Sequence, residues 1–447
     1  MNLNKNIEEV TVVGAGLAGS EAALQLAARG VSVRLIEMRS KVQTAVHKTD
    51  LPAELVCSNS FKTTNPNSAS GALKDELEIY GSYLLREAKA VSVAAGGALA
   101  VDRVAFSKRV KELIDANPHI IYSNEEITKL PTESCIIATG PLTSDALSDA
   151  IAKECGSDYL AFFDAAAPII EADSIDMDVV FAQSRYGHGG SADYLNAPFS
   201  KEQYESFYNE LICADRVIEK DFERKELFAA CQPIEEVART GIDALRFGAL
   251  KPVGLTDPKT GKRPYAAVQL RAENNEVSAY NLVGFQTNLK FPEQKRVFKM
   301  IPGLENAEFA RFGVMHRNTF IDSPHCLSST FALPNNPHVH FAGQLTGTEG
   351  YCEAIASGLY MVLVLYAELK GYPAPVLPKE TMFGSLLTYA TDSTVQDYQP
   401  MHVNYGILKP IEPHIKKKVA RHAANANRAR EHARLFVKNN PQLFQTI

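Results

Sequence analysis

The sequence has no CxxC pair, no long apolar run and no excess of basic residues. Its seven cysteines are scattered without CxxC or histidine spacing, which argues against a zinc site or a disulfide framework. The longest strongly apolar stretch, Leu359 to Ala367, is too short to cross a bilayer. The first eight residues are polar and show no secretory signal. We therefore expect a reduced, cytoplasmic protein without a metal centre and without a membrane partner.

The chain has 447 residues, of which 45% are hydrophobic and 22% charged, as is ordinary for a globular protein of about two domains. Its net charge of −6 does not suggest a nucleic-acid binder. The charge is unevenly distributed, however, because the stretch from Lys409 onward has nine basic residues against two acidic ones. This polarity is typical of a phosphate-binding face, and the alternative is a solvated charged helix. The nine are Lys409, Lys416, Lys417, Lys418, Arg421, Arg428, Arg430, Arg434 and Lys438.

The N-terminus has the pattern strand, glycine turn, helix, strand. A β-branched run at 9–13 precedes a GxGxxG turn, an Ala- and Leu-rich helix follows at 20–29, and a second strand at 31–36 ends in Glu37. This context is specific for a dinucleotide site, because the glycines allow a pyrophosphate to approach the helix N-terminus and the acidic residue can accept from a ribose hydroxyl. A structural βαβ unit without a ligand is the alternative. The predicted ligand-binding residues here are Gly14, Ala15, Gly16, Leu17, Ala18, Gly19 and Glu37.

Two further strand-and-glycine units return to the same sheet. One lies at 135–140 and ends in Thr139 and Gly140; the other lies at 339–344 and ends in Gly343 and Gln344, before a helix predicted from Glu349 to about Leu369. A late return of this kind favours a flavin over a nicotinamide, because the isoalloxazine lies across the sheet toward a second helix N-terminus. Tyr351 could stack there on a flavin or a pterin, or could simply pack in the core.

The predicted fold is α/β, with a doubly wound parallel sheet built from both ends of the chain. We expect a discontinuous dinucleotide-binding domain at 1–150 and 305–447, interrupted by an insertion domain at 151–304.

Nine segments, in order along nearly the whole chain, together resemble one family. They are Ala53 to Ser60, Gly96 to Arg103, Ile136 to Leu142, Asp164 to Ile169, Cys231 to Glu235, Lys251 to Leu255, Val283 to Thr287, Gly313 to Thr319 and Gly343 to Gly350. The chain is similar to the folate- and FAD-dependent tRNA uracil-5-methyltransferases, the TrmFO family. The resemblance implies a two-part, glutathione-reductase-like FAD-binding Rossmann fold with an inserted α+β domain.

The resemblance also implies an activity. A one-carbon unit would pass from 5,10-methylenetetrahydrofolate to carbon 5 of the T-loop uridine at position 54 of tRNA, with FAD reduced by NADH or NADPH. Two alternatives stay open: the same chemistry on ribosomal RNA, or a small-molecule flavin oxidoreductase with no RNA role. A longer flavoprotein acting at the tRNA wobble position shares the late glycine-rich segment, but it has an additional helical C-terminal domain for which this chain is expected to have no room.

Uracil methylation needs an activated thiol, because carbon 5 is a poor nucleophile until a group adds at carbon 6. The resemblance gives catalytic roles to Cys57 and Cys231 only. Cys231 is favoured as the nucleophile, and Cys57 as the group that supports the folate-derived carbon or removes the carbon-5 proton; the reverse assignment stays open. A basic set around Cys231 in the sequence could lower a thiol pKa and hold RNA. The other five cysteines, Cys135, Cys155, Cys213, Cys326 and Cys352, are assigned to packing.

Overall fold

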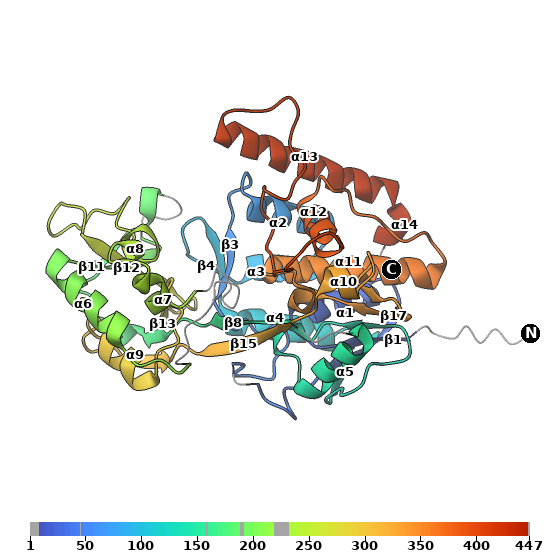
Figure 1. The fold of residues 1–447 in the computed structure, drawn as a ribbon, viewed down its shortest axis with the longest axis horizontal. Helices are drawn as coiled ribbons and strands as arrows, with labels where there is room; N and C mark the ends of the chain where they lie inside the picture. The colour runs from blue at the N-terminus through green and yellow to red at the C-terminus, as the bar shows by residue number, and fades with distance from the viewer. Residues whose placement is uncertain (1–8, 45, 157–159, 188–191, 219–231, 446–447) are drawn as a thin grey trace, which may run out of the picture.

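A computed structural model of the chain describes residues 9–44, 46–156, 160–187, 192–218 and 232–445. It consists of two parts, each with its own sheet, and a two-stranded ribbon runs between them (Figure 1). We call them the nucleotide part, which contains β1, and the middle part, which is drawn from residues 169–311.

The nucleotide part is built on a six-stranded sheet in which every pairing is parallel except that of β16 with β17. Its strands, in spatial order, are β16 (Ala332–Leu333), β17 (Asn336–Phe341), β7 (Cys135–Ile137), β1 (Glu9–Val13), β2 (Ser32–Glu37) and β6 (Ile120–Asn124). The strand β1 is buried from its second residue onward and rich in valine, as expected for a strand covered on both faces. The predicted α/β class with a parallel Rossmann-like sheet is confirmed, and the strand at 9–13 forms over the predicted residues.

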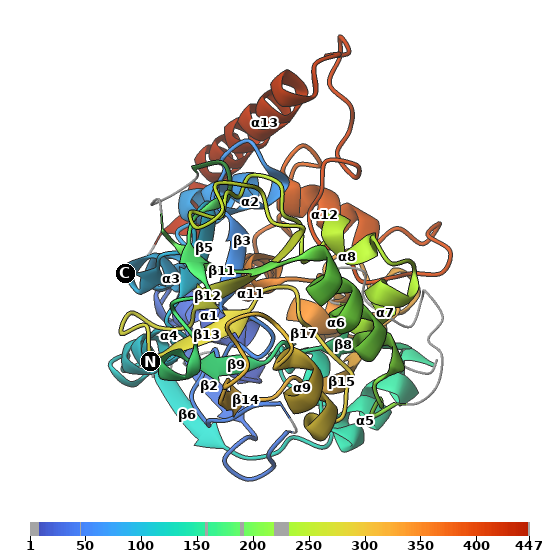
Figure 2. The same ribbon diagram turned by 90° about the vertical axis from the view of Figure 1, so that its left-hand side faces the viewer.

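Helices pack on and around this sheet. The helix α1 (Leu17–Ala27) is buried along its whole length and packs against α11 (Tyr351–Lys370). The others in this part are α2 (Ala69–Ile79), α3 (Tyr83–Ala90), α4 (Arg103–Asp115), α5 (Asp145–Cys155), α10 (Ser323–Cys326), α12 (Met382–Ala390), α13 (Lys418–Asn439) and α14 (Pro441–Phe444). A small sheet of β3 (Ser60–Thr63), β5 (Ala98–Val101) and β4 (Ser92–Val93) accompanies them. The helix α13 lies on the outside of the molecule, over α2 (Figure 1, Figure 2).

Within the described residues, α11 is the one helix long and apolar enough to cross a membrane, and 83% of its apolar window is buried in the fold. The core helix of a soluble protein passes the same test, so α11 is weak evidence for a span. The helix begins eight residues before the apolar run that starts at Leu359, and the residues from Cys352 to Gly358 are also buried.

The middle part is an antiparallel sheet covered by helices. Its strands, in spatial order, are β10 (Phe181–Ala182), β11 (Tyr194–Phe199), β12 (Ala266–Ala272), β13 (Ala279–Leu282), β9 (Ile169–Glu171) and β14 (Phe309–Arg311). Its helices are α6 (Lys201–Cys213), α7 (Ile234–Arg239), α8 (Ala244–Phe247) and α9 (Phe291–Phe298). The ribbon that joins the two parts pairs β8 (Leu160–Ala165) with β15 (Met315–Phe320).

The hydrophobic core divides in the same way. One large cluster takes its residues from 10–151 and 320–443, and a second from 167–307. The domain division at 150 and 305 stays a prediction, which this separation of the two clusters supports. The strand nearest the second boundary, β14, pairs with β9 of the middle sheet.

Candidate active site

The glycine turn after β1 brings α1 unusually close to the sheet. A Cβ on Gly14, whose φ is +96°, would lie 2.6 Å from the carbonyl oxygen of Ala138, and a Cβ on Gly19 would lie 1.8 Å from that of Gly14. At Gly16, by contrast, a Cβ would meet nothing within 4 Å. Two of the glycines are therefore required by packing, whereas the third leaves open space at the N-terminus of α1.

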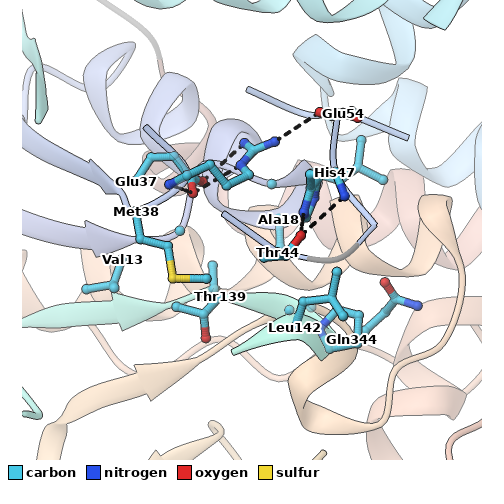
Figure 3. A pocket seen from close by; sticks show the side chains of 18 of the residues that line it. Val13, Ala18, Glu37, Met38, Thr44, His47, Glu54, Thr139, Leu142 and Gln344 are labelled. Carbon is cyan, nitrogen blue, oxygen red and sulfur yellow. Dashed lines mark hydrogen bonds and ion pairs between the residues drawn. The ribbon is translucent and has the colours of Figure 1, made fainter. Parts of the chain in front are cut away.

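That open space belongs to a cavity, which we call the dinucleotide cavity, at the carboxyl ends of β1, β2, β7 and β17. Twelve residues are predicted from the sequence to bind the cofactor. Those that line the cavity are Gly14, Gly16, Leu17, Ala18, Glu37, Thr139, Gly140, Gly343, Gln344 and Tyr351. In Figure 3, Glu37 and Glu54 lie above the cavity, and Thr139, Leu142 and Gln344 lie below it. The two other predicted residues act through their backbones: Gly19 packs on Gly14, and the N–H of Ala15 donates to Glu37 Oε2 at 2.9 Å.

Glu37 is buried but remains a carboxylate. Burial opposes its ionisation, but the guanidinium of Arg39 and the hydrogen bonds from Ala15 and Arg39 outweigh burial and lower its pKa. The Nε of Arg39 lies 3.0 Å from Glu37 Oε1. In the part of the chain that the structure describes, the Nη1 of Arg39 is buried without a hydrogen-bond partner, 3.6 Å from Glu54 Oε2. Arg39 was missed in the sequence, although it follows the acidic strand end by only two residues.

The late glycine segment reaches the same cavity because α11 packs tightly on α1. A Cβ on Gly358 would lie 2.1 Å from the carbonyl oxygen of Ala18, so the two helices touch at backbone distance. The N–H of Gly343 donates to Ser357 Oγ of α11 at 2.9 Å, which ties the turn after β17 to that helix. The N-termini of α1 and α11 therefore open on neighbouring sides of one cleft.

These features fit a flavin dinucleotide. The N-terminus of α1 has no side-chain cap, so its backbone N–H groups are available to a pyrophosphate. The ionised Glu37 can accept from ribose hydroxyls, and the unpartnered nitrogen of Arg39 offers a donor in the same wall. No cluster of three or more His, Cys, Asp or Glu side chains is placed to hold a metal ion among the residues that the structure describes.

A second cavity, which we call the Cys57 cavity, adjoins the first. Both are lined by Val56, Pro141, Gln344 and Tyr351, so the two cavities are neighbours in one region that we call the cleft. The Cys57 cavity is also lined by Cys57, Ser58, Ser60, Phe61, Lys62, Ser70, Gln286, Asn318, Glu349, Gly350, Cys352 and Glu353. Cys57 itself is half-buried and lies in the loop before β3.

Tyr351 connects the two cavities and also fixes the thiol loop. Its hydroxyl oxygen accepts from the backbone N–H groups of Cys57 and Ser58, each at 3.2 Å, and donates to the carbonyl oxygen of Ser58 at 2.9 Å. Its ring lies edge-on to Phe61, with 5.4 Å between the centroids. Burial raises the pKa of Tyr351, so the hydroxyl stays protonated. The sequence suggested only stacking or core packing for this residue, and anchoring of the loop is an additional role.

Cys231 lies outside the described residues. The described chain resumes immediately after Cys231, and the N–H of Ile234 donates to the carbonyl oxygen of Gln286 at 2.7 Å. Gln286 lines the Cys57 cavity.

The assignment of the remaining cysteines to packing is wrong at one position. Cys135, Cys326 and Cys352 are buried and Cys155 is half-buried, but Cys213 is exposed at the end of α6. That helix buries Tyr204, Phe207 and Leu211, and position 213 falls on the opposite face.

The fold and the cleft define a flavoprotein of the two-part dinucleotide-binding class. Among solved structures, the chain is similar to Aquifex aeolicus GidA in its form II crystal, with a TM-score of 0.69 at 15% identity over 98% of this chain and 74% of that chain. The form I crystal of the same protein gives a TM-score of 0.69 at 14% identity, over 97% and 78%. The family model described as "Glucose inhibited division protein A" matches residues 9–373.

Curated relatives are much closer in sequence. A protein of Acetivibrio thermocellus named methylenetetrahydrofolate–tRNA-(uracil-5-)-methyltransferase TrmFO is 51% identical over 424 residues, which are 95% of this chain and 97% of the relative. Proteins of the same name from Natranaerobius thermophilus and Bacillus cereus are 51% and 50% identical, over 92% and 96% of this chain and 95% and 98% of theirs. The chain belongs to the TrmFO family.

Proposed function

We propose that the protein is a tRNA (uracil-5-)-methyltransferase that takes its one-carbon unit from 5,10-methylenetetrahydrofolate and works with FAD and NADH or NADPH in the cytoplasm. The proposed target is the T-loop uridine at position 54. The observation that carries the proposal is the adjacency of the two cavities: the dinucleotide cavity and the cavity of the half-buried Cys57 share four lining residues. The relatives at about half identity carry this activity in their names, and neither of the alternative functions is favoured.

The residues of the dinucleotide cavity hold the cofactor in this proposal. The N-terminus of α1 and the turn at Gly14 and Gly16 receive the pyrophosphate, and Glu37 receives a ribose. Thr139, Gly140, Gly343, Gln344 and Tyr351 line the remaining wall. Bound FAD, once reduced by NADH or NADPH, would supply the hydride that turns a transferred methylene into a methyl group.

The two cysteines divide the work on the uracil. Addition of a thiolate to carbon 6 makes carbon 5 nucleophilic, and a second group must remove the carbon-5 proton before the thiolate leaves. We assign the addition to Cys231, and the handling of the folate-derived carbon or of the proton to Cys57. That both cysteines work at this cleft is supported by the position of Cys57 in its wall and by the hydrogen bond of Ile234, close to Cys231 in the sequence, to Gln286 of the same wall. The division of roles between them follows the family resemblance.

The tRNA would bind with the help of the exposed basic residues of the C-terminal region. Three arginines of that region are used internally: Arg421 donates to the carbonyl oxygen of Ile415, Arg428 to that of Pro410, and Arg430 pairs with Asp75 at 2.6 Å. The other six of the nine basic residues from Lys409 onward are exposed, and their side chains make no ion pair or hydrogen bond within the described residues. These are Lys409, Lys416, Lys417, Lys418, Arg434 and Lys438. An exposed cationic surface without internal partners is available to phosphates.

Labelled methylenetetrahydrofolate tests the proposal. The holoprotein is incubated with unmodified tRNA, ¹³C-methylene-labelled folate and NADH or NADPH, and the nucleosides are analysed by mass spectrometry. We expect labelled 5-methyluridine at position 54. Label in ribosomal RNA but not in tRNA would support the sister activity, and folate-independent NAD(P)H oxidation without label in either RNA would favour a small-molecule oxidoreductase.

A further inference from the structure

Two arginines from different parts of the molecule hold the loop that carries Cys57. Arg103, at the start of α4, donates through Nη1 to the carbonyl oxygen of Leu55 at 2.9 Å. Arg311, at the end of β14 in the middle part, donates through Nη2 to the carbonyl oxygen of Val56 at 2.7 Å. The two carbonyls that immediately precede Cys57 are therefore each bound by a guanidinium.

The far side of the loop is anchored equally firmly. Asn59 is fully buried, and its Nδ2 donates to the carbonyl oxygens of Val101 and Ala272, each at 3.1 Å. Its Oδ1 accepts from the Nε of Arg271 at 2.9 Å. With Tyr351 bonded to the backbone of Cys57 and Ser58, the loop has little freedom to move away from the arginines.

The charges around the thiol do not cancel. Arg103 is neutralised by Glu273, with contacts of 2.7 and 3.2 Å between guanidinium nitrogens and carboxylate oxygens. Arg311 is half-buried, and within the described residues its buried Nε has no hydrogen-bond partner. Burial, and then repulsion from Arg103, lower the pKa of Arg311, and both arginines interact electrostatically with Cys57. The groups that interact electrostatically with the thiol are the two guanidiniums and the neutral hydroxyl of Tyr351, and Glu273 lies beside the guanidiniums. The same cavity is also lined by Glu349 and by Lys62 and Glu353, which pair with each other at 3.7 Å. Within the arginine cluster, two cations therefore stand against one carboxylate.

We propose that Arg311 is a positioning residue for the Cys57 thiol: it fixes the loop through Val56, and its charge, the second cation beside the single carboxylate of Glu273, favours the thiolate. A cation near a thiol lowers the pH at which the thiolate forms, commonly by one to three pH units when the groups lie within about 4–6 Å. The middle part therefore contributes to the reactivity of a cysteine that belongs to the nucleotide part. The relevance to methyl transfer rests on the proposed function, whereas the thiolate itself can be measured without it.

The test is the pH profile of alkylation of Cys57 in the holoprotein, without tRNA or folate. Iodoacetamide labelling is followed by peptide mass spectrometry, which separates Cys57 from the exposed Cys213. We expect the midpoint of the wild-type profile to lie below the value of about 8.5 for an ordinary thiol. Arg311→Gln should raise the midpoint by about one pH unit or more. Arg311→Lys, which keeps the charge, should retain part of the shift.

Arg296→Gln is the matched control. Arg296 is an exposed arginine of the middle part that pairs with Glu293 and Glu210, and its removal should leave the profile unchanged. If Arg311→Gln does not fold, as judged by flavin content, Glu273→Gln decides, because removal of the anion that offsets Arg103 should lower the midpoint. An unchanged midpoint in Arg311→Gln, or a raised one in Glu273→Gln, would overturn the inference. Failure of the methylation assay with these shifts intact would instead count against the proposed function alone.

Discussion

The two cavities of the cleft are built in different ways. The dinucleotide cavity is made mostly from strand ends and the turns that directly follow them, and it is held by close backbone packing within the nucleotide part, such as that of Gly14 on Gly19 and of Gly358 on Ala18. The Cys57 cavity gathers residues from near 57, 286, 318 and 350, which meet only in the folded chain. Backbone packing within one part of the molecule therefore supports the first cavity, whereas the second also needs residues of the middle part.

The largest effect is expected where the dinucleotide turn is packed backbone to backbone. Gly19→Ala places a methyl group 1.8 Å from the carbonyl oxygen of Gly14, so α1 must move away from β1. We expect a decrease of about 3 kcal/mol or more in the free energy of unfolding, with poor recovery of folded protein. Chemical denaturation measures it. A variant as stable as the wild type would show that the close approach is not required.

Gly16→Leu separates the cofactor site from the fold. Its Cβ would enter open space and its φ of −72° suits any residue, so the fold should survive. The larger side chain should block the pyrophosphate, and the purified protein should be colourless, with a circular dichroism spectrum like that of flavin-free wild type. Full flavin occupancy in this variant would contradict the assignment of the cavity.

The exposed lysines before α13 should affect RNA binding and leave both cavities intact. Substitution of Lys416, Lys417 and Lys418 by alanine should weaken tRNA binding and reduce the log–log salt slope by about 0.7 to 0.9 for each phosphate that is no longer neutralised. Flavin content should not change. The control removes three exposed lysines elsewhere, Lys108, Lys129 and Lys153, with the same change in net charge. Equal slopes for the two triple variants would assign the C-terminal basic residues to solvation only.

The smallest effect concerns a buried carboxylate in the middle part. Burial raises the pKa of Glu235 from 4.5 to about 7, although Asn288 N–H and Thr287 Oγ1 donate to its oxygens. Because the folded-state pKa is the higher one, the native state binds an additional proton between about pH 4.5 and 7, and its contribution to stability falls as pH rises through that window.

The variant Glu235→Gln should therefore lose part of this pH dependence. Thermal unfolding between pH 4.5 and 8, compared with wild type, measures it. A variant whose melting temperature varies with pH as strongly as the wild type would show that Glu235 does not titrate in this range.

The sequence was sufficient for the sheet and the dinucleotide turn because strand, glycine spacing and acidic strand end are local signals. The predicted strand at 9–13 and the helix from 349 to about 369 match β1 and α11 within about two residues. The anchoring of Cys57 could not be predicted, since Tyr351 lies 294 residues away and Arg311 reaches Val56 across 255. No residue pattern specifies such pairs, because they depend on how the middle part docks. Cys213 was misassigned for a simpler reason: which face of α6 is buried depends on its neighbours.

The central claim, that a cysteine thiol of this protein adds to uracil in tRNA, can be tested with tRNA carrying 5-fluorouracil at position 54. Fluorine cannot leave as a cation, so the adduct should be trapped and appear as a slower band on a denaturing gel. We predict that the wild type and Cys57→Ala trap the tRNA, that Cys231→Ala does not, and that all three still accept hydride from NADH or NADPH. Trapping by Cys231→Ala but not by Cys57→Ala would reverse the two roles. Absence of any covalent complex with the wild type, in the presence of folate and reductant, would contradict the account.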